Sequence, residues 1–207
     1  MNAQTEYLLQ DGPAGSIEVA IDRPEGEPLG WAVIAHPHPL HGGSLHNKVV
    51  QTLARAFVLA GWSALRLNFR GVGRSQGAFD HGSGERDDVL AVVQAQAAQG
   101  PLCLAGFSFG AFVASHVAGR LQAERDLQRL VLVGTATSRF EVALLAQELR
   151  PRSLIIHGEQ DEVVPLSSVF DWARPQALPV LVLPGCGHFF HGQLPLLRDL
   201  VGRHLRA

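Results

Sequence analysis

Short apolar runs alternate with longer segments of helical character along most of this chain. The runs are largely continuous in their hydrophobicity instead of alternating with polar residues, which is typical of strands buried on both faces. Helices that follow such strands one by one predict a mainly parallel sheet with helices packed on it. The runs are Trp31–Ala35, Ser63–Phe69, Leu102–Phe107, Leu130–Gly134, Leu154–His157 and Val180–Leu183.

The segments between these runs have helical patterns. Val49, Leu53 and Phe57 recur close to the helical period, and Gly61 follows them as a helix stop. Acidic residues gather at the start of the next candidate, where carboxylates complement the helix dipole. We expect helices over Lys48–Ala60, Glu85–Gln99, Gly110–Leu121, Arg139–Leu149, Ser167–Trp172 and Leu194–Leu205.

These elements predict one α/β domain over residues 1–207, with a mostly parallel sheet and helices on both faces. The sheet should have about seven or eight strands, because Glu6–Leu9 and Ser16–Ile21 are expected to add an antiparallel edge hairpin. On folding, a chain of 207 residues buries roughly 70% of the surface that its unfolded form exposes, which is enough to fold without disulfides or a structural metal. Pro151 closely follows Arg139–Leu149, which leaves room for one helix in that connection and none for a lid domain.

Composition and charge exclude several classes of function. The formal net charge is −2 and the basic residues are scattered singly, whereas nucleic-acid binding relies on clustered lysines and arginines. No stretch approaches the ~20 apolar residues that span a bilayer, and the first residues lack the features of a secretory signal. Cys103 and Cys186 are far apart in the sequence, so we expect reduced thiols and a cytoplasmic protein.

The sequence GFSFG at residues 106–110 matches the pattern G-x-S-x-G and lies between a predicted strand and a predicted helix. In a nucleophile elbow this turn is so tight that the serine is strained, and flanking glycines avoid collisions between strand and helix. Ser108 would then project at the carboxyl edge of the sheet, with the N–H of Phe109 facing a bound carbonyl. The alternative is a strand–helix turn with a structural serine.

A serine hydroxyl needs a neighbouring base before it can act as a nucleophile. His188 lies in a glycine-rich loop just after the last predicted strand, from which a histidine can reach across the strand ends. His191 competes for the role but follows two phenylalanines that we expect to pack. We therefore predict His188 as the base, with a solvated loop histidine as the alternative.

The base in turn needs a carboxylate that fixes its tautomer and stabilises its protonated form. Asp161 follows the predicted strand Leu154–His157 and is our candidate for this carboxylate. Glu159 and Glu162 compete with it, and we expect both of them to be solvated.

Ser108, Asp161 and His188, with the strand before each of them, resemble the α/β-hydrolase superfamily, whose triads follow this chain order. The likeness extends through the blocks HPHPLHGGS (36–44), NKVV (47–50) and NFRGVGRS (68–75). These blocks resemble a group of small bacterial serine hydrolases that have no lid. The resemblance implies an α/β-hydrolase fold and ester hydrolysis.

The resemblance also implies that the loop after Trp31–Ala35 supplies a second donor for the oxyanion, beside the N–H of Phe109. Pro37 and Pro39 have no N–H, so the donor is His38 or Leu40, and both remain open. Proline stands here where the superfamily more commonly has His-Gly, which makes the path of this loop distinctive.

Four histidines, His36, His38, His41 and His46, raise the question of a metal site. A zinc site would use an i,i+4 pair on a helix or a cysteine–histidine cluster with a carboxylate. The two prolines force an extended path here, and the spacings match no such pattern. We predict no metal and no cofactor, with His36 in the core wall and His41 and His46 at the rim.

The predicted substrate is a small-molecule carboxylic ester with a short acyl chain, hydrolysed through an acyl-enzyme. Phe107, Phe109, Phe189 and Phe190 flank the predicted triad and could form part of an apolar acyl pocket. A thioesterase or a peptidase would use the same triad. A non-catalytic binding protein on the same fold is the alternative from a different class.

Overall fold

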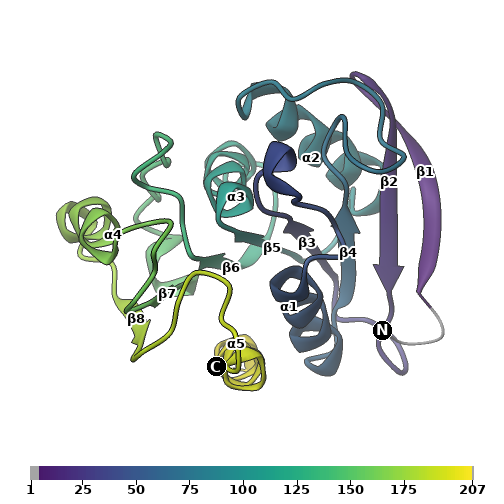
Figure 1. Cartoon of the computed structure of the whole chain (residues 1–207). Coiled ribbons are helices and arrows are strands. Elements are labelled where there is room, and N and C mark those ends of the chain that lie inside the picture. Colours follow the sequence, from purple (N-terminus) through teal and green to yellow (C-terminus); the bar gives the residue numbers. More distant parts are fainter. Residues whose placement is uncertain (1–4, 207) are drawn as a thin grey trace.

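The computed structural model describes residues 5–206, which contain one eight-stranded sheet (Figure 1). Its strands are β1 (Glu6–Gly12), β2 (Gly15–Asp22), β3 (Trp31–Ala35), β4 (Ser63–Leu67), β5 (Leu102–Phe107), β6 (Leu127–Val133), β7 (Ser153–Gly158) and β8 (Val180–Leu183). They lie in the order β1-β2-β4-β3-β5-β6-β7-β8. β3 to β8 are parallel, whereas the β1–β2 hairpin joins the edge of β4 in antiparallel pairing.

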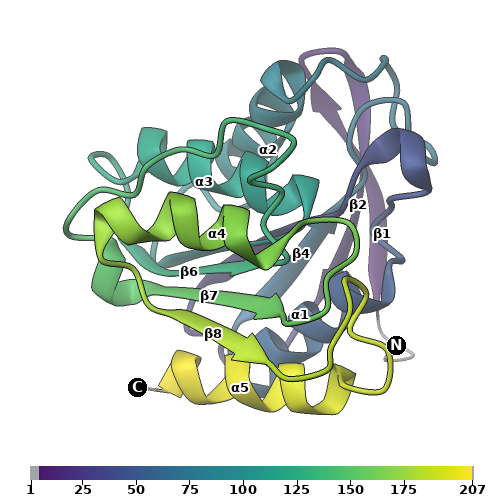
Figure 2. The same cartoon turned by 60° about the vertical axis from the view of Figure 1, so that its left-hand side comes forward.

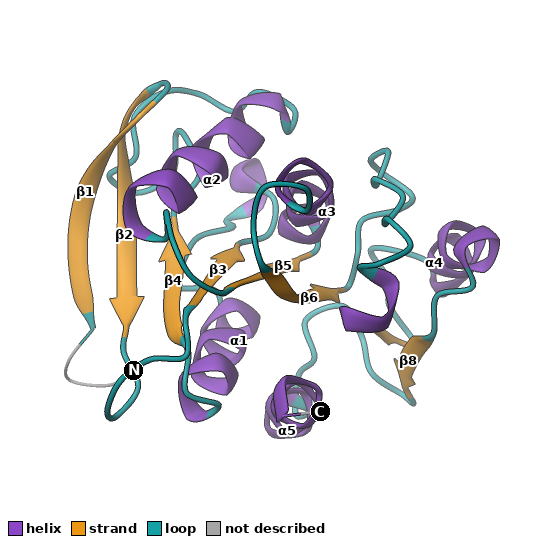
Figure 3. Cartoon of the chain, turned by 180° about the vertical axis from the view of Figure 1, so that it is seen from behind, coloured by secondary structure: helices purple, strands orange, loops and turns teal. Residues whose placement is uncertain are grey.

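Helices cover both faces of this sheet, which therefore forms the middle layer of three (Figure 3). The helices are α1 (Lys48–Leu59), α2 (Ser83–Gln96), α3 (Phe109–Leu121), α4 (Leu166–Ala173) and α5 (Leu194–Arg206), with the 3-10 turns η1 (Pro39–His41), η2 (Arg150–Arg152) and η3 (Arg174–Gln176). α1 and α5 pack side by side on one face, and α2, α3 and α4 lie on the other (Figures 1 and 2). No helix within residues 5–206 is long and apolar enough to cross a membrane.

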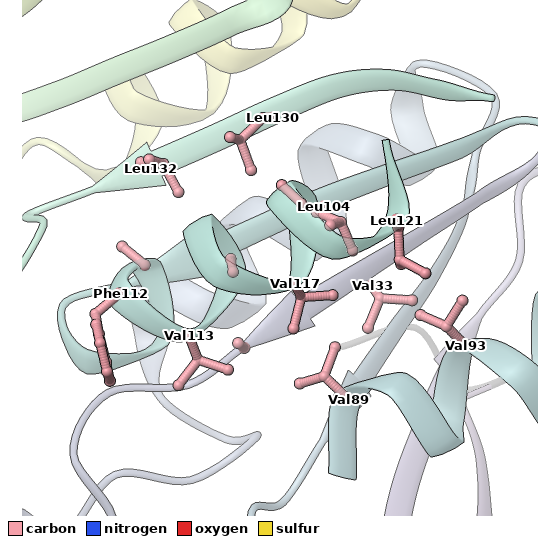
Figure 4. Close-up of a cluster of buried hydrophobic side chains, with 14 of the residues drawn as sticks. Val33, Val89, Val93, Leu104, Phe112, Val113, Val117, Leu121, Leu130 and Leu132 are labelled. Atoms are coloured by element: carbon pink, nitrogen blue, oxygen red, sulfur yellow. The ribbon is translucent and has the colours of Figure 1, made fainter. Parts of the chain in front are cut away.

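Two buried apolar clusters, one on each face, explain why the strands are continuously hydrophobic. Along β5, Leu102 and Leu104 point into the cluster beneath α2 and α3, and Cys103 and Ala105 point into the cluster beneath α1 and α5. In the first cluster, side chains of both helices meet Leu104 and Val33 of the sheet (Figure 4). Burial on both faces is the arrangement predicted for a parallel sheet between helical layers.

The structure confirms the six predicted parallel strands, the N-terminal hairpin and five of the six predicted helices, with shifted ends. α2 begins at Ser83, two residues before its predicted start, where the Glu85 carboxylate accepts the N–H of Gly82 and caps the helix. It ends at Gln96, three residues before its predicted end. β4 ends at Leu67, two residues earlier than predicted.

The predicted helix over Arg139–Leu149 is wrong, because residues 137–149 form turns and irregular backbone. Side chains of neighbouring elements bind backbone groups that a helix would use internally. The Ala143 N–H donates to Ser115 Oγ of α3 at 3.1 Å, and the Leu145 N–H donates to Gln176 Oε1 at 2.7 Å. These tertiary bonds satisfy the segment without helix formation.

The parallel strands end at one edge of the sheet, where their following loops gather (Figure 2). The loops after β3, β5, β7 and β8 carry His38, Ser108, Asp161 and His188, respectively. In open α/β sheets this carboxyl edge is where ligands bind. The topology thus assembles the predicted site from four loops that are far apart in sequence.

Candidate active site

Ser108 occupies a strained turn between β5 and α3, with φ 56° and ψ −115°. The two glycines of the motif allow this turn to be tight. A Cβ at Gly106 would lie 2.2 Å from the Gly110 carbonyl oxygen, and a Cβ at Gly110 would lie 2.2 Å from the Ala35 carbonyl oxygen. Strain held by surrounding structure is a feature of functional positions.

The structure brings Ser108, His188 and Asp161 into one hydrogen-bonded chain. His188 Nε2 lies 3.0 Å from Ser108 Oγ, and His188 Nδ1 lies 2.7 Å from Asp161 Oδ2. The competing histidine, His191, is exposed. Glu159 accepts the N–H of Gly185 at an exposed turn.

Glu162, the other competing carboxylate, does not reach the imidazole. Its Oε2 accepts the backbone N–H of His188 at 3.3 Å, so it holds the loop and not the ring. Asp161 is therefore the carboxylate bonded to the His188 side chain.

Asp161 is fixed by bonds to both of its oxygens. Oδ1 accepts the N–H of Val163 at 2.9 Å and the N–H of Val164 at 2.7 Å, which leaves Oδ2 for His188. Burial raises the pKa of this carboxyl, but the hydrogen bonds from His188 and Val164 outweigh it and leave the pKa below its ordinary value. The carboxylate is thus ionised at neutral pH.

His157 is a neighbour of this chain that sequence analysis missed. It lies near the end of β7, its side chain is fully buried, and its Nε2 is 2.9 Å from the Val164 carbonyl oxygen and 3.3 Å from Asp161 Oδ2. The available signal was a polar residue ending an apolar run four positions before Asp161.

The two candidates for the second oxyanion donor differ in the structure. The Leu40 N–H donates to Nδ1 of His38 at 3.2 Å, inside the turn that opens η1. Within residues 5–206, no acceptor is found for the N–H of His38. Phe109 is the first residue of α3, so its N–H lies at the positive end of the helix dipole.

His36 has both ring nitrogens committed to the backbone, which leaves neither for a metal. Nδ1 lies 2.6 Å from the Pro37 carbonyl oxygen and Nε2 accepts the N–H of Phe69 at 3.0 Å. Burial lowers the pKa of His36 to about 4. His36 is buried in the core wall, as predicted, whereas His41 and His46 are both exposed.

The four phenylalanines near the triad do not line an acyl pocket together. Phe107, Phe109 and Phe190 are buried in the core, whereas Phe189 is 41% exposed and its ring stands edge-on to His188. Of the four residues that could form part of an acyl pocket, only Phe189 therefore offers an exposed ring, and the other three pack in the interior.

A separate aromatic wall stands beside the elbow. The ring of His38 packs at 4.7 Å from Phe79 and at 6.0 Å from Phe140, measured between centroids, and all three are partly exposed. The wall joins the elbow through Phe109, whose ring lies 5.2 Å from His38 and 5.1 Å from Phe140, measured between centroids.

Comparison with known proteins places the chain in a family. A family model described as serine aminopeptidase, S33, matches residues 38–146, which include Ser108 and the loop at His38. An uncharacterised protein of Rickettsia prowazekii (strain Madrid E) is 30% identical over 191 residues, which cover 87% of this chain and 80% of that protein.

Solved structures give the same result. An α/β serine hydrolase without a lid from Xanthomonas campestris matches with a TM-score of 0.89 and 37% identity, covering 100% of this chain and 95% of that chain. An α/β serine hydrolase homologue from Coxiella burnetii matches with a TM-score of 0.85 and 42% identity, covering 97% of each chain. The chain therefore belongs to the α/β serine hydrolase family whose model is described as serine aminopeptidase, S33, and it is one of the members without a lid.

Proposed function

We propose that this protein hydrolyses carboxylic esters through an acyl-enzyme, with Ser108 as nucleophile, His188 as base and Asp161 as the orienting carboxylate. The observation that carries the proposal is the unbroken chain of 3.0 Å and 2.7 Å contacts from Ser108 Oγ through His188 to Asp161. Membership of the serine hydrolase family supports the reaction class.

The first step transfers one proton and forms one bond. Asp161 accepts the Nδ1–H of His188, so Nε2 carries the lone pair that faces Ser108. As Ser108 Oγ attacks the ester carbonyl carbon, its proton moves to Nε2, and the carbonyl electron pair moves onto oxygen. Asp161 stabilises the imidazolium that results.

We assign the oxyanion to the N–H groups of Phe109 and His38. The choice of His38 over Leu40 rests on the bond between the Leu40 N–H and the His38 ring, which occupies the Leu40 donor. Each preorganised donor would stabilise the developing charge by roughly 3–4 kcal/mol.

The remaining steps reuse the same groups. The oxyanion collapses, the bond to the alcohol breaks, and His188 gives its proton from Nε2 to the departing oxygen. Water then attacks the acyl-enzyme while His188 takes a proton from it. As the second oxyanion collapses, the bond between the acyl carbon and Ser108 Oγ breaks, His188 returns the proton from Nε2 to Oγ, and the acid is released. These steps use the side chains and backbone of this chain.

We propose short acyl chains as the preferred substrates, which could contact the exposed apolar surface that Phe189, Leu40 and the wall around His38 offer at this edge of the sheet. We also propose a cytoplasmic location, which is consistent with Cys103 and Cys186 being buried free thiols.

A peptidase is the second candidate, since the family description names an aminopeptidase. One acyl group presented as a p-nitrophenyl ester, a thioester and an anilide distinguishes the leaving groups, with Ser108→Ala as the matched control. We expect the ester to be hydrolysed fastest and Ser108→Ala to be inactive on all three. Faster cleavage of the anilide would replace the esterase proposal with a peptidase, and activity retained by Ser108→Ala would refute the nucleophile.

A further inference from the structure

Asp161 has a second histidine partner besides His188. His157 has a side chain with no exposed surface, and its Nε2 lies 3.3 Å from Asp161 Oδ2, the same oxygen that binds His188. The role of His157 is a separate question from that of His188, because it lies on the far side of the carboxylate from Ser108 in the hydrogen-bonded chain.

The partners of His157 fix its tautomer. The Val164 carbonyl oxygen, 2.9 Å from Nε2, can only accept, so Nε2 carries the proton. That N–H is donated to Val164, and the same Nε2 lies 3.3 Å from Asp161 Oδ2 as an electrostatic contact. Nδ1 is buried and has no hydrogen-bond partner within residues 5–206.

The same environment keeps His157 neutral. A second proton would sit on Nδ1, where it would be buried without an acceptor, at a substantial cost in free energy. Burial is also the main reason that the pKa of His157 is lowered. Asp161 therefore faces a neutral imidazole here, which does not cancel its negative charge.

Asp161 lies among four polar groups. Oδ1 accepts two backbone N–H groups, and Oδ2 accepts from His188 and lies 3.3 Å from His157 Nε2. Among the described residues, the only other carboxylate that faces His188 is Glu162, which binds its backbone N–H. Ser108 and the rings of Phe107 and Phe189 complete the surroundings of the His188 ring.

We propose that His157 is a positioning residue for the triad: its neutral Nε2–H binds the Val164 carbonyl oxygen and so holds the loop whose N–H groups bind Asp161, and its N–H dipole lies against Asp161 Oδ2. This inference rests on the proposed function. Loss of the donor would concentrate the carboxylate charge on His188, which favours the protonated imidazole. The reactivity of Ser108 would then decline at a higher pH than in the wild type.

Two substitutions separate this role from simple packing. His157→Leu fills a similar volume without a donor. His157→Gln places an amide N–H at about the reach of Nε2 and so retains a donor. The measurement is the second-order rate of inactivation by a fluorophosphonate as a function of pH, which reports on Ser108 without knowledge of the natural substrate.

For His157→Leu we expect the acidic midpoint of this profile to rise by roughly half a pH unit and the plateau rate to fall about tenfold. His157→Gln should keep the wild-type midpoint and most of the plateau rate. Unfolding midpoints of both variants show whether each is folded at the assay temperature.

Profiles of His157→Leu and His157→Gln that both match the wild type would overturn the inference. Equal losses in the two variants with unmoved midpoints would also overturn it, because a packing role predicts that result. Wild-type protein that does not react with the probe would instead refute the proposed function, which keeps the two failures distinct.

Discussion

At the scale of single residues, the site depends on the hydrogen bonds that hold each polar atom in place. Both oxygens of Asp161 are held by hydrogen bonds, Oδ1 by the N–H groups of Val163 and Val164 and Oδ2 by His188. The imidazole of His188 is consequently held in one tautomer with Nε2 toward Ser108. This commitment makes the role of Asp161 testable by a change of one atom.

Asp161→Asn replaces an acceptor with an amide and favours the wrong tautomer of His188. We expect kcat for ester hydrolysis to fall by about four orders of magnitude, with little change in KM. Glu162→Gln is the matched control and should cost far less, because Glu162 binds only the backbone of His188. A larger loss in Glu162→Gln than in Asp161→Asn would show that the assigned carboxylate is wrong.

His36 links stability to pH. Its pKa in the folded protein is lowered from 6.5 to about 4, so between these values the unfolded chain binds a proton that the native state does not. Acid therefore favours unfolding across this window, by roughly 3 kcal/mol from this residue.

His36→Gln removes the titrating group at the cost of the bonds to Pro37 and Phe69. Urea unfolding should show the variant to be less stable at pH 7. Its deficit relative to the wild type should shrink as the pH falls from 6.5 towards 4, the window set by the lowered pKa. A deficit that stays constant over this range would contradict the buried, neutral state of His36.

Ser108, Asp161 and His188 of the proposed triad could be picked out from the sequence because each has a local signal: a motif, a strand end or a glycine-rich loop. His157 and the choice between His38 and Leu40 could not. Both depend on contacts made across loops or on the orientation of a single N–H, which no spacing in the sequence encodes.

At the scale of elements, the turn between β5 and α3 depends on the absence of two side chains. Gly110→Ala places a Cβ 2.2 Å from the Ala35 carbonyl oxygen. We expect it to lower the free energy of unfolding by roughly 1–3 kcal/mol and to reduce hydrolysis by displacing Ser108. Gly119→Ala, in the same helix with no heavy atom within 4 Å, should instead stabilise by roughly 0.5–1 kcal/mol. Equal effects of the two substitutions in chemical denaturation would contradict the close approach at Gly110.

The segment 137–149 shows the limit of helical patterns as evidence. The predicted helix over Arg139–Leu149 fails because Ser115 and Gln176, from elements that pack against the segment, bind its amides. A helix prediction from one segment cannot include acceptors supplied by another. By contrast, the helices that pack an apolar face on the sheet were predictable, because the apolar residues of that face recur at helical spacing within the helix itself.

Ser115→Ala tests this explanation. The Ser115 hydroxyl is buried, donates to the Phe112 carbonyl and accepts the N–H of Ala143 at 3.1 Å. Its loss should cost about 1–3 kcal/mol and speed hydrogen exchange at Ala143, with α5 as an unaffected internal reference. Unchanged exchange at Ala143 would show that the bond does not hold the segment.

At the scale of the whole molecule, the parallel order of the strands gathers the loops that carry the site residues. It brings Ser108, Asp161 and His188 to one edge of one sheet, although 53 positions separate the first two in the sequence and 27 separate the last two. The long connection between β6 and β7 contains irregular backbone and η2 and has no inserted domain. This general architecture was predictable because each strand and most helices carry their own pattern.

The central claim is that this architecture makes the hydroxyl of Ser108 reactive. The most direct measurement is the mass of the wild-type protein, of Ser108→Ala and of His188→Ala after treatment with a fluorophosphonate, followed by peptide mapping. We expect one adduct on Ser108 in the wild type, none at this site in Ser108→Ala and strongly slowed labelling in His188→Ala. Folded wild-type protein that gains no adduct at Ser108, or that is labelled equally fast without His188, would contradict the account.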